Sequence, residues 1–187
     1  MALAESKAES EVRQAKELMQ QKKYDESIPL LDSAIKDDAQ LKSAYLLRGE
    51  SKEHLKKYEQ AIDDYSKYIL LVPTDPEVYQ RMSKVNADTG KTNSAVSYLS
   101  KALVMKPKDG QLYADRADLY DKLGEKNLAS IDREVARKLG VEVVAASATA
   151  GLKSIKVVVK HNVARSAVAP KSAAHTKSAV IKGSGSK

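Results

Sequence analysis

Apolar and small residues recur at spacings of three and four along two adjacent stretches of the chain. In AYLLRGESKEHLKKY (44–58), one helical stripe carries Tyr45, Leu46, Gly49 and Leu55. In YEQAIDDYSKYILLV (58–72), another stripe carries Tyr58, Ala61, Ile62, Tyr65, Tyr68 and Ile69. This spacing predicts two amphipathic α-helices. The small residues Gly49 and Ala61 would let the two helices approach closely, at the short end of about 8–10 Å.

The same pattern returns every 34 residues. KKYDESI (22–28) is followed by KKYEQAI (56–62), and aligned columns continue through the chain. The columns hold Ser27, Ala61, Ala95 and Ala129; Ala34, Tyr68, Ala102 and Ala136; Ala15, Gly49, Ser83 and Ala117; and Tyr45, Tyr79 and Tyr113. A fixed period of this length is the signature of a repeat architecture in which each unit buries its apolar face against its neighbours.

The repeat also contains residues that are typical of helix ends. Asp75 followed by Pro76 reads as an N-cap and a first helical residue, and Asp109 occupies the equivalent cap one repeat later. Gly90 and Gly124 suit tight turns within the third and fourth units, and Gly140 suits the end of the last helix. The sequence therefore predicts eight helices, arranged as four antiparallel hairpins.

The repeat resembles the tetratricopeptide repeat family. The best copy, residues 42–75, shows the family's pattern of aromatic, small and closing residues in Tyr45, Gly49, Ala61, Tyr65 and Pro73. The other copies run roughly over 8–41, 76–109 and 110–141. The resemblance implies an all-α fold, a right-handed superhelix of antiparallel helix hairpins, over a domain of residues 1–140.

Two substitutions stand at the ends of the array. Glu11 replaces the aromatic residue of the first-helix column, and Arg133 replaces the column of Leu31, Tyr65 and Leu99. A solenoid needs polar terminal faces, so both are interpreted as caps of a four-repeat array. A degenerate further repeat is the alternative.

In this family the first helix of each repeat lines a groove that holds a partner peptide or helix. By that resemblance the groove here would be lined by Arg13, Lys16, Gln20, Leu46, Leu47, Glu50, His54, Gln80, Arg81, Lys84, Asp88, Ala114, Asp115, Asp118 and Lys122. The set is basic at its start and acidic at its end, which predicts a protein partner with acidic and basic stretches in matching order. The alternative is a solvated helix face without a ligand.

Co-chaperone members of the family clamp the acidic end of a chaperone with Lys, Asn and Arg. Val12 and Leu47 stand where that clamp needs Lys and Asn, and of its positions only Arg81 matches. The chain is therefore not expected to be a carboxylate-clamp chaperone binder.

Candidate chemistry is sparse. There is no cysteine, so disulfides, thiol nucleophiles and thiolate metal sites are excluded. Adjacent carboxylates such as Asp63 and Asp64 point about 100° apart on a helix, and the three histidines lack metal-ligand spacing. We expect no catalytic residue, no metal, no cofactor and no enzymatic activity.

Net charge separates the chain into two regions. Residues 1–140 hold 24 Lys/Arg and 24 Asp/Glu, whereas residues 141–187 hold 8 Lys/Arg and one acid. Few large apolar residues occur in this Ala-, Ser-, Lys- and Val-rich tail, which predicts disorder. Its basic positions are Lys153, Lys156, Lys160, Arg165, Lys171, Lys177, Lys182 and Lys187. They would attract nucleic acid, an anionic membrane or an acidic protein, or would only solubilise the chain.

No run of about 18 apolar residues suggests a membrane span, and the N-terminus lacks the apolar core of a signal peptide. We expect a cytoplasmic protein, with the nucleus as the alternative compartment. The function predicted is a non-enzymatic scaffold or adaptor with a basic tail for electrostatic attachment. A nucleoprotein component that contacts RNA or DNA through the tail is the second hypothesis, and a co-chaperone or secretion adaptor is the third.

Overall fold

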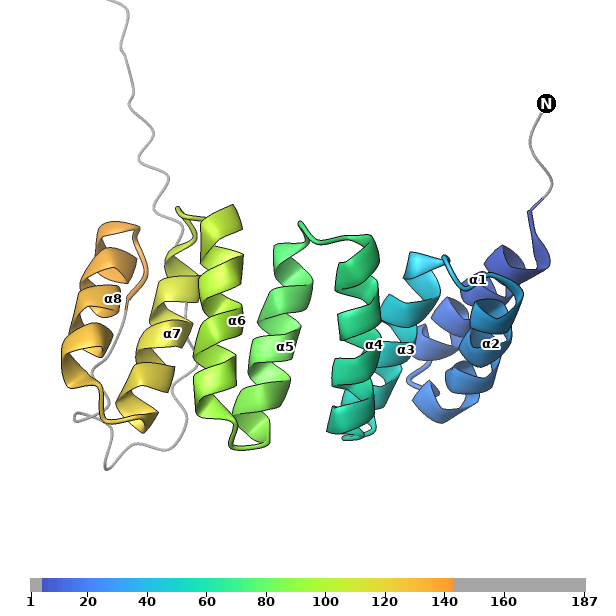
Figure 1. The fold of residues 1–187 in the computed structure, drawn as a ribbon, viewed down its shortest axis with the longest axis horizontal. Coiled ribbons are helices and arrows are strands. Elements are labelled where there is room, and N and C mark those ends of the chain that lie inside the picture. Colours follow the sequence, from blue (N-terminus) through green and yellow to red (C-terminus); the bar gives the residue numbers. More distant parts are fainter. Residues whose placement is uncertain (1–4, 143–187) are drawn as a thin grey trace, which may run out of the picture. The chain divides into compact units, whose positions relative to one another are not determined.

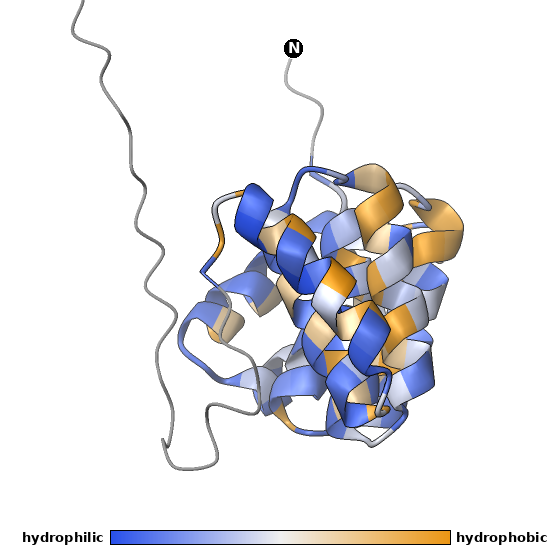
Figure 2. Cartoon of the chain, turned by 90° about the vertical axis from the view of Figure 1, so that its left-hand side faces the viewer, coloured by the Kyte–Doolittle hydropathy of each residue, from blue (hydrophilic) through white to orange (hydrophobic). Residues whose placement is uncertain are grey.

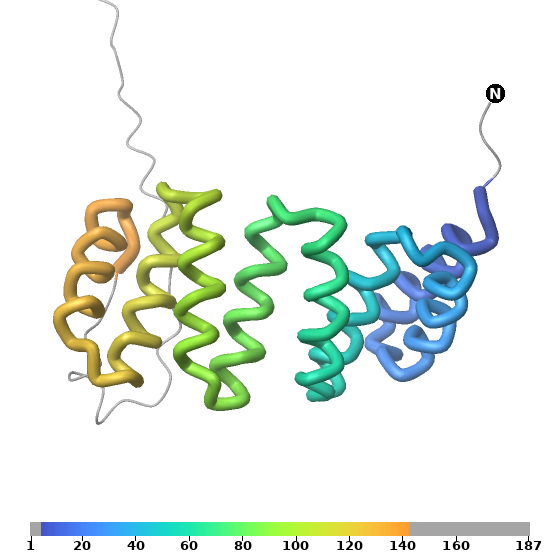
Figure 3. Tube along the Cα trace, in the orientation of Figure 1, coloured from blue at the N-terminus to red at the C-terminus, as the bar shows by residue number. Residues whose placement is uncertain are grey.

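Residues 5–142 are described by the computed structural model, and they form eight α-helices without a strand. The helices are α1 Lys7–Gln20, α2 Tyr24–Asp37, α3 Lys42–His54, α4 Tyr58–Leu71, α5 Pro76–Asp88, α6 Thr92–Met105, α7 Gly110–Lys122 and α8 Lys126–Lys138. They form four antiparallel hairpins that follow one another along the chain (Figures 1 and 3). This is the α-solenoid expected from the 34-residue period. The basic tail positions from Lys153 to Lys187 lie outside the described residues.

The predicted N-caps are confirmed. The Asp75 carboxylate accepts the backbone N–H of Glu77 at 3.0 Å, and Pro76 begins α5. Asp109 accepts the backbone N–H of Gln111 at 3.1 Å and starts α7 in the same way. Both caps satisfy donors that a helix leaves unpaired at its first turn.

The turn within each hairpin places one residue in the left-handed region, but the residue type differs along the array. Gly90 (φ 77°) and Gly124 (φ 78°) take this role in the third and fourth hairpins, as predicted. Lys22 (φ 61°) and Lys56 (φ 59°) take it in the first two. A side chain at such a φ is disfavoured, so the first two turns are more strained than the last two.

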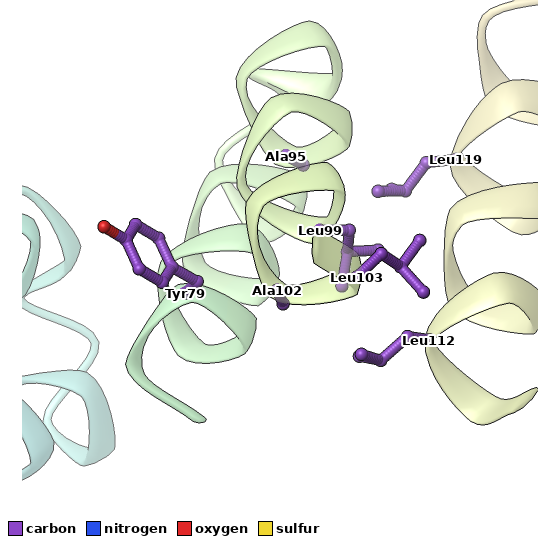
Figure 4. Packing of buried hydrophobic residues seen from close by; sticks show 7 residues of the cluster. All are labelled: Tyr79, Ala95, Leu99, Ala102, Leu103, Leu112 and Leu119. Atoms are coloured by element: carbon purple, nitrogen blue, oxygen red, sulfur yellow. The ribbon is translucent and has the colours of Figure 1, made fainter. Parts of the chain in front are cut away.

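Helix amphipathicity builds a core that continues from one repeat to the next. Hydrophobic and hydrophilic positions share the same helices (Figure 2). Around α6, Leu99 and Leu103 meet Leu112 and Leu119 of α7, while Tyr79 lies on the other side of α6 (Figure 4). Each hairpin therefore completes its core with side chains of its neighbour, as the repeat period predicts.

The second hairpin requires glycine at position 49 of α3, because the residue that faces this position from α4 is the aromatic Tyr65. A Cβ at Gly49 would lie 2.7 Å from Cε1 of the buried Tyr65, which no real Cβ tolerates. In the third hairpin the same two columns hold Ser83 and Leu99. Small and large residues thus compensate each other across each hairpin.

The two expected end caps lie inside their own hairpins. Glu11 of α1 accepts the Ser33 hydroxyl of α2 at 2.8 Å, and Arg133 of α8 donates to Asp121 and Asp118 of α7. The Arg133 side chain is only 16% exposed, so its charge serves the α7–α8 hairpin and is not displayed on the end face. One repeat after the buried Leu103 of α6, the equivalent position of α8 is Arg137. The Arg137 side chain, unlike that of Arg133, is exposed.

Candidate functional site

A cavity of about 500 Å³ opens between the helices of the third and fourth hairpins. We call it the groove cavity. It is lined by Glu53 of α3; Glu77, Gln80, Arg81, Ser83, Lys84 and Ala87 of α5; Leu99 of α6; and Asp115, Asp118, Leu119 and Lys122 of α7. Its walls are therefore the first helices of successive repeats, and its floor includes α6.

The α5 wall of the groove cavity is basic, but its charges are already paired. The Arg81 guanidinium lies 2.8 Å from the carboxylate of Glu50 and 3.4 Å from that of Glu53. The Lys84 ammonium lies 3.1 Å from Glu53. Both carboxylates come from α3, so the cations of α5 face acids of the preceding repeat.

Glu53 is the centre of this cluster. Its side chain is 10% exposed, and it also accepts the Tyr65 hydroxyl at 2.7 Å. Burial alone would raise the pKa of Glu53, but the bonds from Tyr65 and Lys84 hold its pKa below the usual range. Burial and the Glu53 charge together raise the pKa of Tyr65 far above its ordinary value. The cluster therefore stays ionised and bonded at neutral pH.

The α7 wall is acidic and less completely paired. Asp115 accepts a bond from the neutral Gln111 amide at 2.7 Å and, within residues 5–142, lies in no ion pair. Asp118 is 70% exposed and lies 3.3 Å from Arg133, whose shorter bond goes to Asp121. Desolvation, with the charges of Asp118 and Asp109, raises the pKa of Asp115 against the opposing Gln111 bond.

The cavity floor is apolar. Leu99 and Leu119 are both buried, and Ala87 is half-buried. A side chain that enters between the polar walls would contact this floor and remove apolar surface from water. The cavity thus combines an apolar base with charged groups at its rim, which is the usual composition of a binding site.

Six of the predicted groove residues line the groove cavity. They are Gln80, Arg81, Lys84, Asp115, Asp118 and Lys122, and Glu50 joins them indirectly through Arg81. The predicted groove residue Ala114 of α7 is buried and does not line the cavity.

The remaining predicted residues lie elsewhere. Leu46 and Leu47 are half-buried and pack against the second and first hairpins' apolar clusters. Arg13 pairs with Glu5 at 3.2 Å. His54 stacks on Tyr24, with ring centroids 4.2 Å apart. Lys16, Gln20 and Asp88 are exposed positions outside the cavity.

Six lining residues were not predicted from the sequence: Glu53, Glu77, Ser83, Ala87, Leu99 and Leu119. Leu99 and Ser83 occupy repeat columns that read as core, so periodicity assigned them to packing alone. Glu53 sits one turn from Gly49 and one position before His54, at a register that the family's groove pattern does not include. Only the pairing of Glu53 with Arg81 and Lys84 shows that it belongs to the site.

Within 5–142, no three His, Asp or Glu side chains gather in a way that could hold a metal ion. None of the helices in this part of the chain combines the length and apolar character that crossing a bilayer requires.

Models of the family described as tetratricopeptide repeat match residues 12–76 and 76–109, which together make up just over half of the chain. Among curated proteins, human "Tetratricopeptide repeat protein 13" is 31% identical over 102 residues, covering 52% of this chain and 12% of that protein. "DnaJ protein P58IPK homolog B" of Oryza sativa subsp. japonica is 34% identical over 73 residues, covering 39% of this chain and 16% of that protein. The chain thus spans less than a fifth of the length of these relatives.

Among solved structures, one described as "Crystal structure of MamA" aligns with a TM-score of 0.68 at 20% identity, covering 71% of this chain and 77% of that chain. "MamA 41-end from Desulfovibrio magneticus RS-1" aligns with a TM-score of 0.66 at 14% identity, covering 71% and 75%. At this identity the likeness establishes the shared fold.

Proposed function

Since the chain belongs to the tetratricopeptide repeat family, whose fold serves as a protein-interaction scaffold, we propose that its groove cavity holds a segment of a partner protein. The observation that carries this proposal is the cavity itself, about 500 Å³ between charged walls and an apolar floor. That volume lies in the range of binding pockets, and its walls come from rigid helices.

The scaffold acts by presenting a preformed surface. The α5 wall is tied to α3 through Glu53, and the α7 wall is tied to α8 through Arg133. Because these side chains are already oriented, a partner segment would lose its own freedom on binding while the groove would lose little.

Site-specific photo-crosslinking tests this function. A photoreactive benzoylphenylalanine at Gln80 lies at the groove cavity, and the same residue at Ser97, an exposed position of α6 outside the cavity, is the matched control. We expect a discrete partner adduct in extracts of the source cells from position 80 alone. The proposal fails if position 80 forms no adduct, or if both positions capture the same proteins equally.

We propose the basic tail as a second contact, for polyanions such as RNA or DNA. Residues 143–187 hold eight Lys/Arg and no acid, which supports an electrostatic attachment. If all eight charges contact single-stranded nucleic acid, the log–log salt slope of the affinity would approach about −5 to −6. Fluorescence titrations of the full chain against an oligonucleotide at several salt concentrations measure that slope, and a slope near zero would refute the contact.

A further inference from the structure

The two walls of the groove cavity differ in how far their charges are satisfied. On the α5 wall, Arg81 and Lys84 lie within 3.4 Å of Glu50 and Glu53. Lys84 is 67% exposed and can still donate, but an incoming carboxylate would either displace Glu53, which is nearly buried and bonded to Tyr65, or lie beside its negative charge. Breaking such a cluster leaves charged groups with poor solvation, so the basic wall is a poor receptor for an acidic ligand.

The α7 wall has the opposite character. Asp115 and Asp118 are three positions apart on one helix, so their side chains lie on the same face. Among residues 5–142, Asp115 receives only the neutral Gln111 amide, and Asp118 is mostly exposed. One cation, Lys122, also lines the cavity on this helix, but no ion pair joins it to either aspartate. This wall therefore retains acceptor capacity that a ligand can use.

Across the whole lining the acids also outnumber the cations. Glu53, Glu77, Asp115 and Asp118 face Arg81, Lys84 and Lys122. Glu77 pairs with Lys106, and the cations of α5 pair with Glu50 and Glu53. The lining charges that remain for a ligand therefore belong to α7, where the carboxylates of Asp115 and Asp118 face the single ammonium of Lys122.

Beneath the α7 wall, Leu119 belongs to the same helix, and Leu99 lies across from it on α6 (Figure 4). A Lys or Arg side chain has an aliphatic stem that can cover apolar surface and a charged head that can remain at the rim. Leu119 below and the two aspartates above match those two parts.

We propose that the α7 wall of the groove cavity binds a cationic side chain, and that the partner segment carries Lys or Arg next to an apolar residue. This inference rests on the proposed function and specifies the partner's chemistry. It replaces the expectation of a partner with both acidic and basic stretches, because the basic wall is internally neutralised. The ammonium or guanidinium head contacts Asp115 and Asp118, and the stem and the neighbouring apolar residue cover Leu119 and Leu99.

Labelled peptides of about twelve residues test the assignment on the full chain. Three peptides built from Ala, Leu and Ser carry Lys, Gln or Glu at the same positions, and fluorescence anisotropy measures their affinities. We expect the Lys peptide to bind most tightly, the Gln peptide to bind about tenfold more weakly, and the Glu peptide to show no binding. Added salt should weaken the Lys peptide most, because its charged contacts are partly exposed.

Variants locate the effect. Asp115→Asn with Asp118→Asn should reduce Lys-peptide affinity about tenfold. Asp25→Asn with Asp63→Asn removes the same charge at exposed positions outside the cavity and should leave the affinity unchanged. Asp115→Lys with Asp118→Lys should transfer the preference to the Glu peptide, and circular dichroism verifies that each variant keeps its helices.

The outcomes separate this inference from the proposed function. If the cavity variant and the control variant lose the same Lys-peptide affinity, the attraction depends only on the net charge of the protein. That result would overturn the assignment of the site to Asp115 and Asp118. If the Glu peptide binds best and depends on Arg81, the groove is a partner site but the charge assignment is wrong. An adduct between position 80 and the chain's own residues 143–187 at all dilutions would replace the partner with an intramolecular occupant. If no peptide binds and position 80 captures nothing, the proposed function fails as well.

Discussion

The junction between the first two repeats and the junction between the second and third use different chemistry. At the first, Arg48 of α3 bonds Asp64 of its own hairpin at 2.6 Å and Asp32 of the preceding hairpin at 2.6 Å. Asp64 is buried and also accepts Lys52 at 2.8 Å. An arginine fork therefore ties three helices, α2, α3 and α4, in a fixed orientation.

The second junction, between α4 and α5, is built from large apolar side chains. At the column of Arg48, α5 carries the buried Met82, which packs with Tyr65, Tyr68, Val78 and Val85. Apolar contacts are not directional, so this junction stabilises the array without fixing its geometry as tightly as an arginine fork does. Its polar ties lie at the groove, where Glu53 meets Arg81 and Lys84.

The third junction returns to the first pattern. Arg116 of α7 bonds Asp132 of its own hairpin at 2.7 Å and the Ser100 hydroxyl of α6 at 2.9 Å. Arg116 and Asp132 each stand 68 positions after Arg48 and Asp64. The arginine–aspartate bridge therefore recurs every two hairpins, although the pair of helices recurs with every hairpin. The array thus consists of two pairs of hairpins, each pair bridged by an arginine, joined through an aromatic junction.

Loss of a bridge is expected to have the largest effect. Asp64→Ala removes the shared acceptor of Arg48 and Lys52 and leaves their charges partly buried, which should lower the free energy of unfolding by about 2–4 kcal/mol. The neighbouring Asp63→Ala, at an exposed position, should stay within about 0.5 kcal/mol. Urea unfolding followed by circular dichroism measures both, and similar losses would contradict the role of the bridge.

The aromatic junction contains Tyr65, whose ring packs closely against Gly49. Gly49→Ala places a Cβ against Tyr65 and should lower the free energy of unfolding by about 1–3 kcal/mol. In a Tyr65→Leu background, which copies the third hairpin, the same substitution should cost much less. A thermal-unfolding double-mutant cycle measures the coupling, and strictly additive effects would show that the contact is unimportant.

Alkaline pH should weaken the aromatic junction. Burial, with the acceptor Asp75 at 2.7 Å, raises the pKa of Tyr68 to about 12. The folded state thus holds this proton more tightly than the unfolded chain, whose tyrosine pKa is about 10. The resulting stabilisation is complete below pH 10 and is lost as pH rises from about 10 to about 12.

Tyr68→Phe should make the fall of stability over that window shallower. Tyr120→Phe, whose half-buried ring has no hydroxyl bond within the described residues, should leave the fall unchanged. The unfolding midpoints of the three proteins, measured between pH 9 and about 12, test this expectation. If the midpoint of Tyr68→Phe falls with pH as steeply as that of the unsubstituted protein, the Tyr68 hydroxyl does not cause the loss of stability.

The smallest effect is expected at a neutral contact of the first junction. The buried hydroxyls of Ser27 and Ser51 lie 2.8 Å apart, across α2 and α3. Ser27→Ala leaves the Ser51 hydroxyl unpaired and should cost about 1 kcal/mol. Ser27→Ala with Ser51→Ala should recover part of that loss, but not the bond that Ser27 donates to the Tyr24 carbonyl at 2.7 Å. If the double variant is as unstable as the sum of the singles, the hydroxyl pair contributes nothing.

Much of the fold could be predicted because it depends on local patterns. Asp75 and Asp109 cap their helices as expected, and Gly90 and Gly124 close their turns. The left-handed Lys22 and Lys56 were less visible, because lysine carries no preference for such a φ and only the alignment with Gly90 and Gly124 reveals the requirement.

The site was less predictable from the same columns. The first-helix register identified Arg81, Lys84, Asp115 and Asp118 as groove residues, and they do line one cavity. It also selected Leu46 and Leu47, which the apolar clusters of their neighbours cover. Whether a first-helix position faces the groove or the adjacent repeat depends on how the hairpins pack, which periodicity does not state.

The sequence by itself determined the helices, their capped ends and their antiparallel pairing, because those features follow from residues a few turns apart. Only the tertiary structure decided which charges remain available. Arg81 and Asp115 are both predicted groove charges, but Arg81 meets Glu50 and Glu53 of another repeat, while the one bond of Asp115 within the described part of the chain comes from the neutral Gln111. Electrostatic pairing depends on distances between residues remote in the chain, and those distances exist only once the repeats have stacked.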